Sequence, residues 1–311
     1  MQPYYVIVTE RTSGSIRAGL PLSLIRSPLR KRCLVSPPFS TLIDPLCNDE
    51  SALQHLYSEL PKLLTKNKIS SMQFKTFLKT ESVPPNVFIR DDKYCHHEVD
   101  LTQSEDKLMS SFNRSNVRNR IKKSLKSPLS LTYAKTHEQL KEFYKLYGLT
   151  RRRLGLPANP MKFFDALWIH LKEANQIELL LVYHEKHLVA GAFCLKYNKR
   201  ISAEALAYDR DFIKMCPNHL LFWSIMLNAK TEGIILFDFG RTPLNNESLL
   251  TFKNRWGTKK SMLPIFSYPK SHLNVSSEPS ASLNLIKGGI KKIPYPLYLR
   301  LSGLYYSKMR S

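Results

Sequence analysis

The chain has 311 residues, 43% hydrophobic and 23% charged, which is enough for one large or two ordinary folded domains and excludes a disordered protein. Lysine and arginine number 47 against 25 aspartate and glutamate residues, giving a formal net charge of +22. This excess favours anionic partners such as tRNA, nucleotide phosphates or an anionic membrane face, unless it only reflects a basic proteome.

The five cysteines are odd in number, widely spaced and free of any CxxC pair, which is typical of reduced thiols in a cytosolic protein. Cys95-His96-His97 lacks distant partners at metal-ligand spacing, and His184-x-x-His187 reads as a turn between strands, so we expect no metal site. The N-terminus has no signal-peptide pattern, and no apolar run reaches the roughly 18 residues of a spanning helix. We therefore expect a cytoplasmic protein.

The first hundred residues give a vague pattern. Strand-like runs at 4–9, 16–25 and 70–78 flank a helix from about 51 to 66, and prolines at 37–38 and 84–85 mark loops. Because the strand pattern starts at once, the chain reads as beginning inside a domain. We interpret residues 1–101 as a shortened version of the half that follows.

A basic connecting helix is predicted over residues 102–128. Thr102 and Glu105 have the spacing of a capping box, and the helix then continues to about Lys126. Its surface carries two parallel stripes, one basic (Arg114, Arg118, Lys122, Lys126) and one apolar (Val117, Ile121, Leu125). The basic stripe predicts either an anionic partner or a solvated surface.

Residues 129–270 give the clearest pattern, ordered as a strand, two helices, three strands, a helix, a strand, a helix and a final strand. Thr136 and Gln139 form a capping box for the first helix. The strands are predicted at 129–133, 177–183, 188–197, 201–208, 234–239 and 262–268, and the helices at 136–154, after 160, at 217–232 and at 247–255. This alternation predicts an α/β (α+β) domain with a mixed sheet flanked by helices.

The tail, residues 271–311, opens as a linker and then interleaves basic with aromatic and aliphatic residues. After Glu278 it contains no acidic residue. Such a segment suits an anionic membrane surface, and it equally suits a terminal helix that packs on the body with its basic side in water.

Two short motifs carry candidate chemistry. Phe237-Asp238-Phe239-Gly240-Arg241 ends a buried strand, where open α/β sheets bind ligands. Asp238 and Arg241 either serve such a site or pair with each other. In the later motif Phe252-Lys253-x-x-Trp256-Gly257, Lys253 is placed to donate to a developing oxyanion.

Taken together, these motifs resemble the C-terminal signature of the FemAB-like acyltransferases of the GNAT superfamily. Arg118-Asn119-Arg120-Ile121-Lys122-Lys123 resembles that family's Arg-Asn-x-Ile-Arg-Lys motif, and the segment 150–157 its Thr-x-x-x-x-Gly-x-Pro helix end. Gly19-Leu20-Pro21-Leu22 and Ser36-Pro37-Pro38-Phe39 resemble its N-terminal landmarks. The likeness covers nearly the whole chain and is strongest to the subgroup found near exopolysaccharide and PEP-CTERM systems.

The resemblance implies two GNAT-like halves and transfer of an acyl or aminoacyl group to an amine, with Lys253 stabilising the tetrahedral intermediate. The acceptor class that it suggests is a cell-envelope or polysaccharide precursor. Catalytic candidates are Lys253, Asp238 and Arg241. Substrate-binding candidates are Arg118, Asn119, Lys122, Tyr208, Arg210, Asn218 and Trp256.

The donor is left open by one departure from the GNAT pattern. The glycine-rich turn that cradles the coenzyme A pyrophosphate corresponds to residues 209–217, which contain no glycine, although Arg210 and Lys214 are available for a phosphate. We expect no bound cofactor, an acyl-CoA or aminoacyl-tRNA co-substrate and no DNA partner. The rival hypothesis is a non-catalytic basic GNAT-fold protein that binds RNA or an anionic surface.

Overall fold

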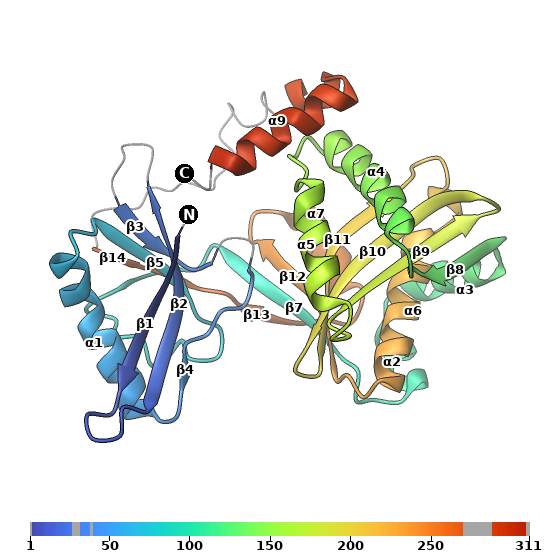
Figure 1. Cartoon of the computed structure of the whole chain (residues 1–311). Helices are drawn as coiled ribbons and strands as arrows, with labels where there is room; N and C mark the ends of the chain where they lie inside the picture. The colour runs from blue at the N-terminus through green and yellow to red at the C-terminus, as the bar shows by residue number, and fades with distance from the viewer. Residues whose placement is uncertain (1, 27–31, 38–39, 270–287, 309–311) are drawn as a thin grey trace.

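The computed structural model describes residues 2–26, 32–37, 40–269 and 288–308, and they form two halves side by side (Figure 1). Each half is built on a mixed, seven-stranded sheet. The predicted fold class, mixed sheets flanked by helices, is confirmed.

The first half packs one long helix on its sheet. Asp49 caps this helix by accepting a hydrogen bond from the Ala52 amide at 2.8 Å. Leu53, Leu56 and Tyr57 of the helix are fully buried against the sheet. The elements are β1 (Gln2–Thr9), β2 (Ile16–Arg26), β3 (Arg32–Val35), β4 (Leu46–Cys47), α1 (Glu50–Lys66), β5 (Ser71–Lys75) and β6 (Ile89–Asp91).

The second half follows the predicted order closely. The capping box of Thr136 and Gln139 is present at the start of its first long helix. Its elements are β7 (Tyr94–Asp100), α2 (Glu105–Ser111), η1 (Arg114–Arg118), α3 (Asn119–Lys126), β8 (Leu129–Tyr133), α4 (His137–Arg153), α5 (Met161–Leu171), β9 (Ile177–His184), β10 (His187–Tyr197), β11 (Arg200–Tyr208), η2 (Ile213–Met215), α6 (Pro217–Thr231), β12 (Leu236–Pro243), α7 (Glu247–Asn254) and β13 (Lys259–Met262).

The two halves exchange strands, which the predicted boundaries at 101 and 270 do not describe. β7, assigned from the sequence to the first half, lies in the second sheet between β13 and β12. β14 (Ile265–Tyr268) returns to the first sheet between β5 and β6. The single strand predicted at 262–268 is therefore wrong. Leu263, after β13, still donates to the Tyr94 carbonyl of β7 at 3.0 Å. The next residue, Pro264, has no N–H to donate, and there the chain leaves β7 for the first sheet.

The single connecting helix predicted over 102–126 is also wrong. Ser104, and not Thr102, caps α2, because the Thr102 amide and hydroxyl both donate to Asp100. After α2 the chain makes a π-helical turn, η1, before α3 begins. Because a π turn is wider than an α turn, it shifts the helical phase, and Leu125 is 59% exposed where burial was predicted.

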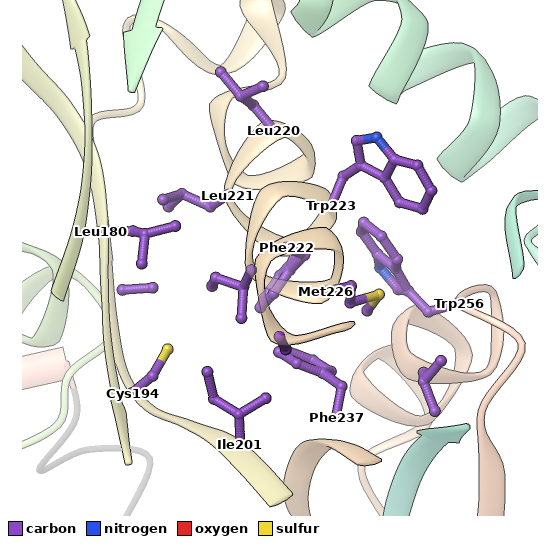
Figure 2. Close-up of a cluster of buried hydrophobic side chains, with 14 of the residues drawn as sticks. Leu180, Cys194, Ile201, Leu220, Leu221, Phe222, Trp223, Met226, Phe237 and Trp256 are labelled. Atoms are coloured by element: carbon purple, nitrogen blue, oxygen red, sulfur yellow. The ribbon is translucent and has the colours of Figure 1, made fainter. Parts of the chain in front are cut away.

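The main core of the second half lies beneath α6. Figure 2 shows consecutive α6 side chains from Leu220 to Trp223 spreading between the sheet and α7. Phe222 lies edge-on to Phe237 of β12 and Trp256 at the end of α7. Such all-round burial explains why nearly every position in this helix is apolar, and it fixes α6 relative to β12.

The described part of the tail ends in α9 (Tyr295–Lys308), which packs against α4 (Figure 1). The sequence alternative of a terminal helix on the body is therefore confirmed for this segment. The linker predicted at the start of the tail, from residue 271, lies outside the described residues as far as residue 287.

Candidate functional site

The candidate site lies where two parallel strands of the second sheet separate. Within the described sheet, β11 and β12 pair over three positions, from Arg200 with Leu236 to Ser202 with Asp238. Beyond these positions β11 follows β10 and β12 follows β7. The sheet therefore opens between the carboxyl ends of β11 and β12, the kind of place where α/β sheets bind ligands.

A bulge in β12 lies at this opening. The register of β12 against β7 shifts between Asp238 and Gly240, and Gly240 has a φ of +71° that side chains other than glycine rarely adopt. The Asp238 carboxylate accepts a hydrogen bond from the Gly240 amide and so holds the bulge. The Phe-Asp-Phe-Gly-Arg motif is thus the sequence of a bulged strand end.

Asp238 belongs to a buried charged network. The His96 Nε2–H donates to its Oδ1 at 2.7 Å, and Arg200 lies 3.4 Å from its Oδ2. Arg200 also bonds Glu98, one side chain along β7 from His96 on the same face. Burial alone would raise the pKa of Asp238, but His96, the Gly240 amide and Arg200 outweigh it and lower the pKa.

Lys253 reaches the same bulge from α7, a helix that Asn246 caps by accepting from the Leu249 amide at 3.2 Å. Its Nζ donates to the Gly240 carbonyl at 2.8 Å and to the Arg241 carbonyl at 3.2 Å. Burial lowers the pKa of Lys253 to about 8, although Asp238 and Cys95 act in the opposite direction. The charged ammonium has three N–H bonds, so one remains for a further acceptor.

Arg241 does not contact Asp238 in this arrangement. Its guanidinium lies 4.4 Å from the centre of the Tyr94 ring and its side chain is exposed. The ion pair suggested for Asp238 and Arg241 is therefore wrong, and Arg200 takes that place. Arg241 stays available to an anionic group at the surface.

The first turn of α6 is close to the opening but offers few amides. Cys216 precedes it with a φ of +60°, and the Cys216 carbonyl accepts from the amides of His219 and Leu220. Pro217 has no N–H, so Asn218 supplies the one amide of this turn without a partner in the described chain. Pyrophosphate cradles need several such amides.

Two other predicted binding residues lie at the end of β11 and just after it, Tyr208 and Arg210. Tyr208 is held by Thr150, which bonds both its amide and its carbonyl, and the Arg153 guanidinium lies 4.4 Å from the centre of its ring. Arg210 is exposed in the loop that leads to η2. Tyr208 is thus rigidly positioned and Arg210 is free to approach an anion.

The helical segment that carries the predicted basic stripe, η1 and α3, packs against α6. The His219 Nε2–H donates to the Asn116 carbonyl of η1 at 3.1 Å, which joins η1 to the first turn of α6. Arg118 has a buried Nε without a hydrogen-bond partner in the described chain, whereas Asn119 and Lys122 are exposed. Arg118 therefore has donor capacity to spare, in the helical turn that contacts the start of α6.

Trp256 is a core residue rather than a contact surface. It is fully buried, and its ring stacks on His219 at a centroid distance of 5.5 Å. The prediction that Trp256 binds substrate directly is therefore wrong for this arrangement. Its effect on the site is to fix α7, and hence Lys253, against α6.

Three residues of the network, His96, Glu98 and Arg200, were missed by sequence reasoning. The signal was available in part, because residues at i and i+2 of a strand share a face and His96 and Glu98 have that spacing. Their partners are 142 and 102 residues away in the chain, a pairing that local patterns do not indicate.

A cavity of about 460 Å³ lies between the two halves, next to this network. Glu98 and Arg200 form its wall on the side of the second sheet. Phe77, Leu78 and Arg90 line it from the first half. A polar group bound here would lie against the Glu98–Arg200 ion pair.

Neither a metal centre nor a membrane span is present among the described residues. No group of three His, Cys, Asp or Glu side chains there is placed to hold a metal ion. None of the described helices is both long and apolar enough to cross a bilayer.

Comparison with known proteins agrees with this fold. Residues 111–253, from the end of α2 to Lys253, match the family described as acetyltransferase (GNAT) domain. The crystal structure of FemX is similar with a TM-score of 0.69 and 17% identity, over 86% of this chain and 88% of FemX. The structure of L-PGS from Bacillus licheniformis is similar with a TM-score of 0.57 and 15% identity, over 91% of this chain and 88% of L-PGS.

A tandem GNAT protein from the clavulanic acid biosynthesis pathway is similar with a TM-score of 0.50 and 12% identity, over 85% of this chain and 82% of that protein. No curated protein sequence matched the chain. At these identities the shared feature is the fold, and the predicted arrangement of two GNAT-like halves is confirmed at that level.

Proposed function

We propose that the chain is an N-acyltransferase that joins an acyl or aminoacyl group to an amine. The match of residues 111–253 to the GNAT acetyltransferase domain and the likeness of the fold to FemX support this proposal. The observation that carries the proposal is the parting of β11 and β12 with a desolvated lysine, Lys253, at its edge. A carbonyl placed in that opening meets a preorganised cation.

In the proposed reaction the acceptor amine attacks the carbonyl carbon of the donor, and the new C–N bond leaves negative charge on the carbonyl oxygen. The free N–H of Lys253 stabilises this oxyanion, while its other two N–H bonds hold the bulge in place. Collapse expels the donor's thiolate or ribose hydroxyl, which receives the proton that the amine loses. Asp238 also fixes the bulge, through the Gly240 amide.

The donor is a coenzyme A thioester or an aminoacyl-tRNA. The poor supply of amides at the first turn of α6 argues against a standard pyrophosphate cradle. Arg118, Lys122 and Arg210 supply cationic side chains around the mouth instead. These side chains suit the phosphates of either donor.

For the acceptor we propose a cell-envelope or polysaccharide precursor that carries an amine and enters from the cavity between the halves. The Glu98 and Arg200 side chains in its wall provide one anion and one cation for orienting a polar substrate. The reaction belongs to the cytoplasm, where both donor classes are made, and it requires no DNA.

The rival function, binding of RNA or an anionic surface without catalysis, is favoured by one observation. Arg114, Lys122 and Lys126 are all exposed along η1 and α3. Such a surface binds phosphates whether or not the opening is active, and this binding would weaken steeply with salt.

The test is a transfer assay that offers labelled acyl-CoA and labelled aminoacyl-tRNA in parallel, with cell extract as the source of acceptors. Transfer from one donor, lost in Lys253→Met, supports the proposal and names the donor class. No transfer from either donor, by a folded protein that binds tRNA in a salt-dependent manner, establishes the rival function.

A further inference from the structure

One face of α9 is fixed on the body of the protein. Tyr298 is 2% exposed and its hydroxyl donates to the Leu156 carbonyl at 2.7 Å. Ser302, also buried, accepts from the Ala158 amide at 3.3 Å. Tyr295 donates to the Lys145 carbonyl of α4 at 3.1 Å. These contacts set the rotation of the helix about its axis.

A neighbouring face of α9 is apolar and uncovered. Its large side chains follow the i, i+4, i+7, i+8 spacing of one helical stripe and are about half exposed: Leu297 49%, Leu301 43%, Leu304 57% and Tyr305 51%. We name these four residues the outer stripe. Figure 1 shows α9 at the periphery of the molecule, above α4.

The surroundings of the outer stripe are basic. Arg300 on α9 and the preceding Lys291 and Lys292 are exposed, and residues 288–308 include no acidic residue. Arg152 at the end of α4 donates to the Lys291 carbonyl at 3.4 Å, which brings a further cation beside them. An apolar stripe with a cationic rim matches a surface that is apolar inside and anionic outside.

A second copy of the chain is a poor partner for this surface. It would bring another basic rim and a net charge of +22 against the first. The charge therefore selects an anionic partner, and the outer stripe requires an apolar one.

We propose that the outer stripe of α9 docks the protein on the surface of an anionic lipid bilayer. The 14 residues of α9 extend about 21 Å at 1.5 Å per residue, too short to span a hydrocarbon core of about 30 Å. The helix lies in the plane of the interface, with the outer stripe among the acyl chains and the basic rim at the phosphates. This docking is independent of the proposed transfer reaction.

Vesicle flotation of the full-length protein tests the proposal. Vesicles rich in phosphatidylglycerol should retain the protein, and vesicles of phosphatidylcholine alone should not. The double variant L301Q/L304Q should lower the partition coefficient at least about tenfold, because two of the four apolar anchors are lost. The matched control is L125Q, which removes an equally exposed leucine beside the basic residues of α3.

A fluorescence variant reports the contact directly. The three native tryptophans are at most 9% exposed, so L297W adds a solvent-exposed reporter to the outer stripe. Its emission should shift to the blue with phosphatidylglycerol vesicles. Flotation unchanged in L301Q/L304Q, or no blue shift in L297W, overturns the proposal. A dimer in light scattering that L301Q/L304Q dissociates also overturns it, by assigning the outer stripe to a second copy.

Discussion

Replacing Lys253 with methionine separates a structural role from a catalytic one. Methionine keeps most of the side-chain volume and removes the charge and all three donors. The depression of the Lys253 pKa from 10.5 to about 8 means that burying the ammonium costs about 3 kcal/mol. Lys253→Met recovers this cost, and it leaves the Gly240 and Arg241 carbonyls without their donor, at about 1–3 kcal/mol each.

These contributions largely offset each other, so the free energy of unfolding should change by no more than about 3 kcal/mol in urea denaturation. Turnover should behave differently, because nothing replaces the lost oxyanion donor. We expect kcat to fall about 10²–10³-fold in the transfer assay. Lys260→Met, which removes an exposed lysine from the neighbouring β13, is the matched control and should leave kcat unchanged.

Two results would refute the catalytic role of Lys253. A loss of kcat smaller than about tenfold, in a variant that unfolds like the wild type, would remove Lys253 from the chemistry. A large loss of stability together with kcat would make Lys253 a clamp on the β12 bulge and nothing more.

Three further outcomes are expected. The pKa of Lys253 in the folded protein is below its unfolded value, so the unfolded chain holds more protons between pH 8 and 10.5 and stability rises with pH. In urea denaturation, the free energy of unfolding of the wild type should therefore increase by up to about 3 kcal/mol relative to Lys253→Met across that range. Asp238→Asn should cost about 3–5 kcal/mol in the same assay, and exposed Arg241→Gln less than about 0.5. Gly148→Ala places a Cβ 2.5 Å from the Tyr295 hydroxyl, so it should release α9 to limited proteolysis, and Tyr295→Phe should partly restore protection.

Local sequence patterns predicted the elements between residues 129 and 255 well, because each is amphipathic or buried with a regular period. The helix from Thr136 is an example, in which the capping box and the apolar stripe of Leu140, Phe143 and Tyr147 all agree. The strand at 262–268 failed for the opposite reason. Its residues have one continuous pattern, but they serve two different sheets, and sheet membership is a long-range property.

Competition between neighbours explains the errors near residue 102. Thr102 and Ser104 are both suitable N-cap residues. The amide and hydroxyl of Thr102 are bonded to Asp100, so Ser104 caps the helix. No count of spacings shows that preference. The π turn at η1 is likewise set by tertiary contact, since the Asn116 carbonyl within it accepts from His219 of α6.

The candidate site was half predictable for the same physical reason. Asp238, Gly240 and Lys253 lie within 16 positions of one another, so short motifs contain them. His96 and Arg200 meet Asp238 through strand pairing in the folded sheet. From the sequence, the nearby arginine at 241 looked like the partner.

The bulge at Gly240 links the buried network around Asp238 to Lys253. Asp238 fixes the bulge through the Gly240 amide, and Lys253 fixes it through the Gly240 carbonyl. Asp238 and Lys253 therefore hold the two successive peptide groups that flank the Gly240 Cα, and they orient both without bonding each other. A module that binds phosphates through surface cations gains nothing from such a desolvated arrangement, whereas a transferase needs a rigid donor where charge develops. The free energy spent on desolvating charged groups lies at the opening and not on the basic surface, and this location favours catalysis over the rival function.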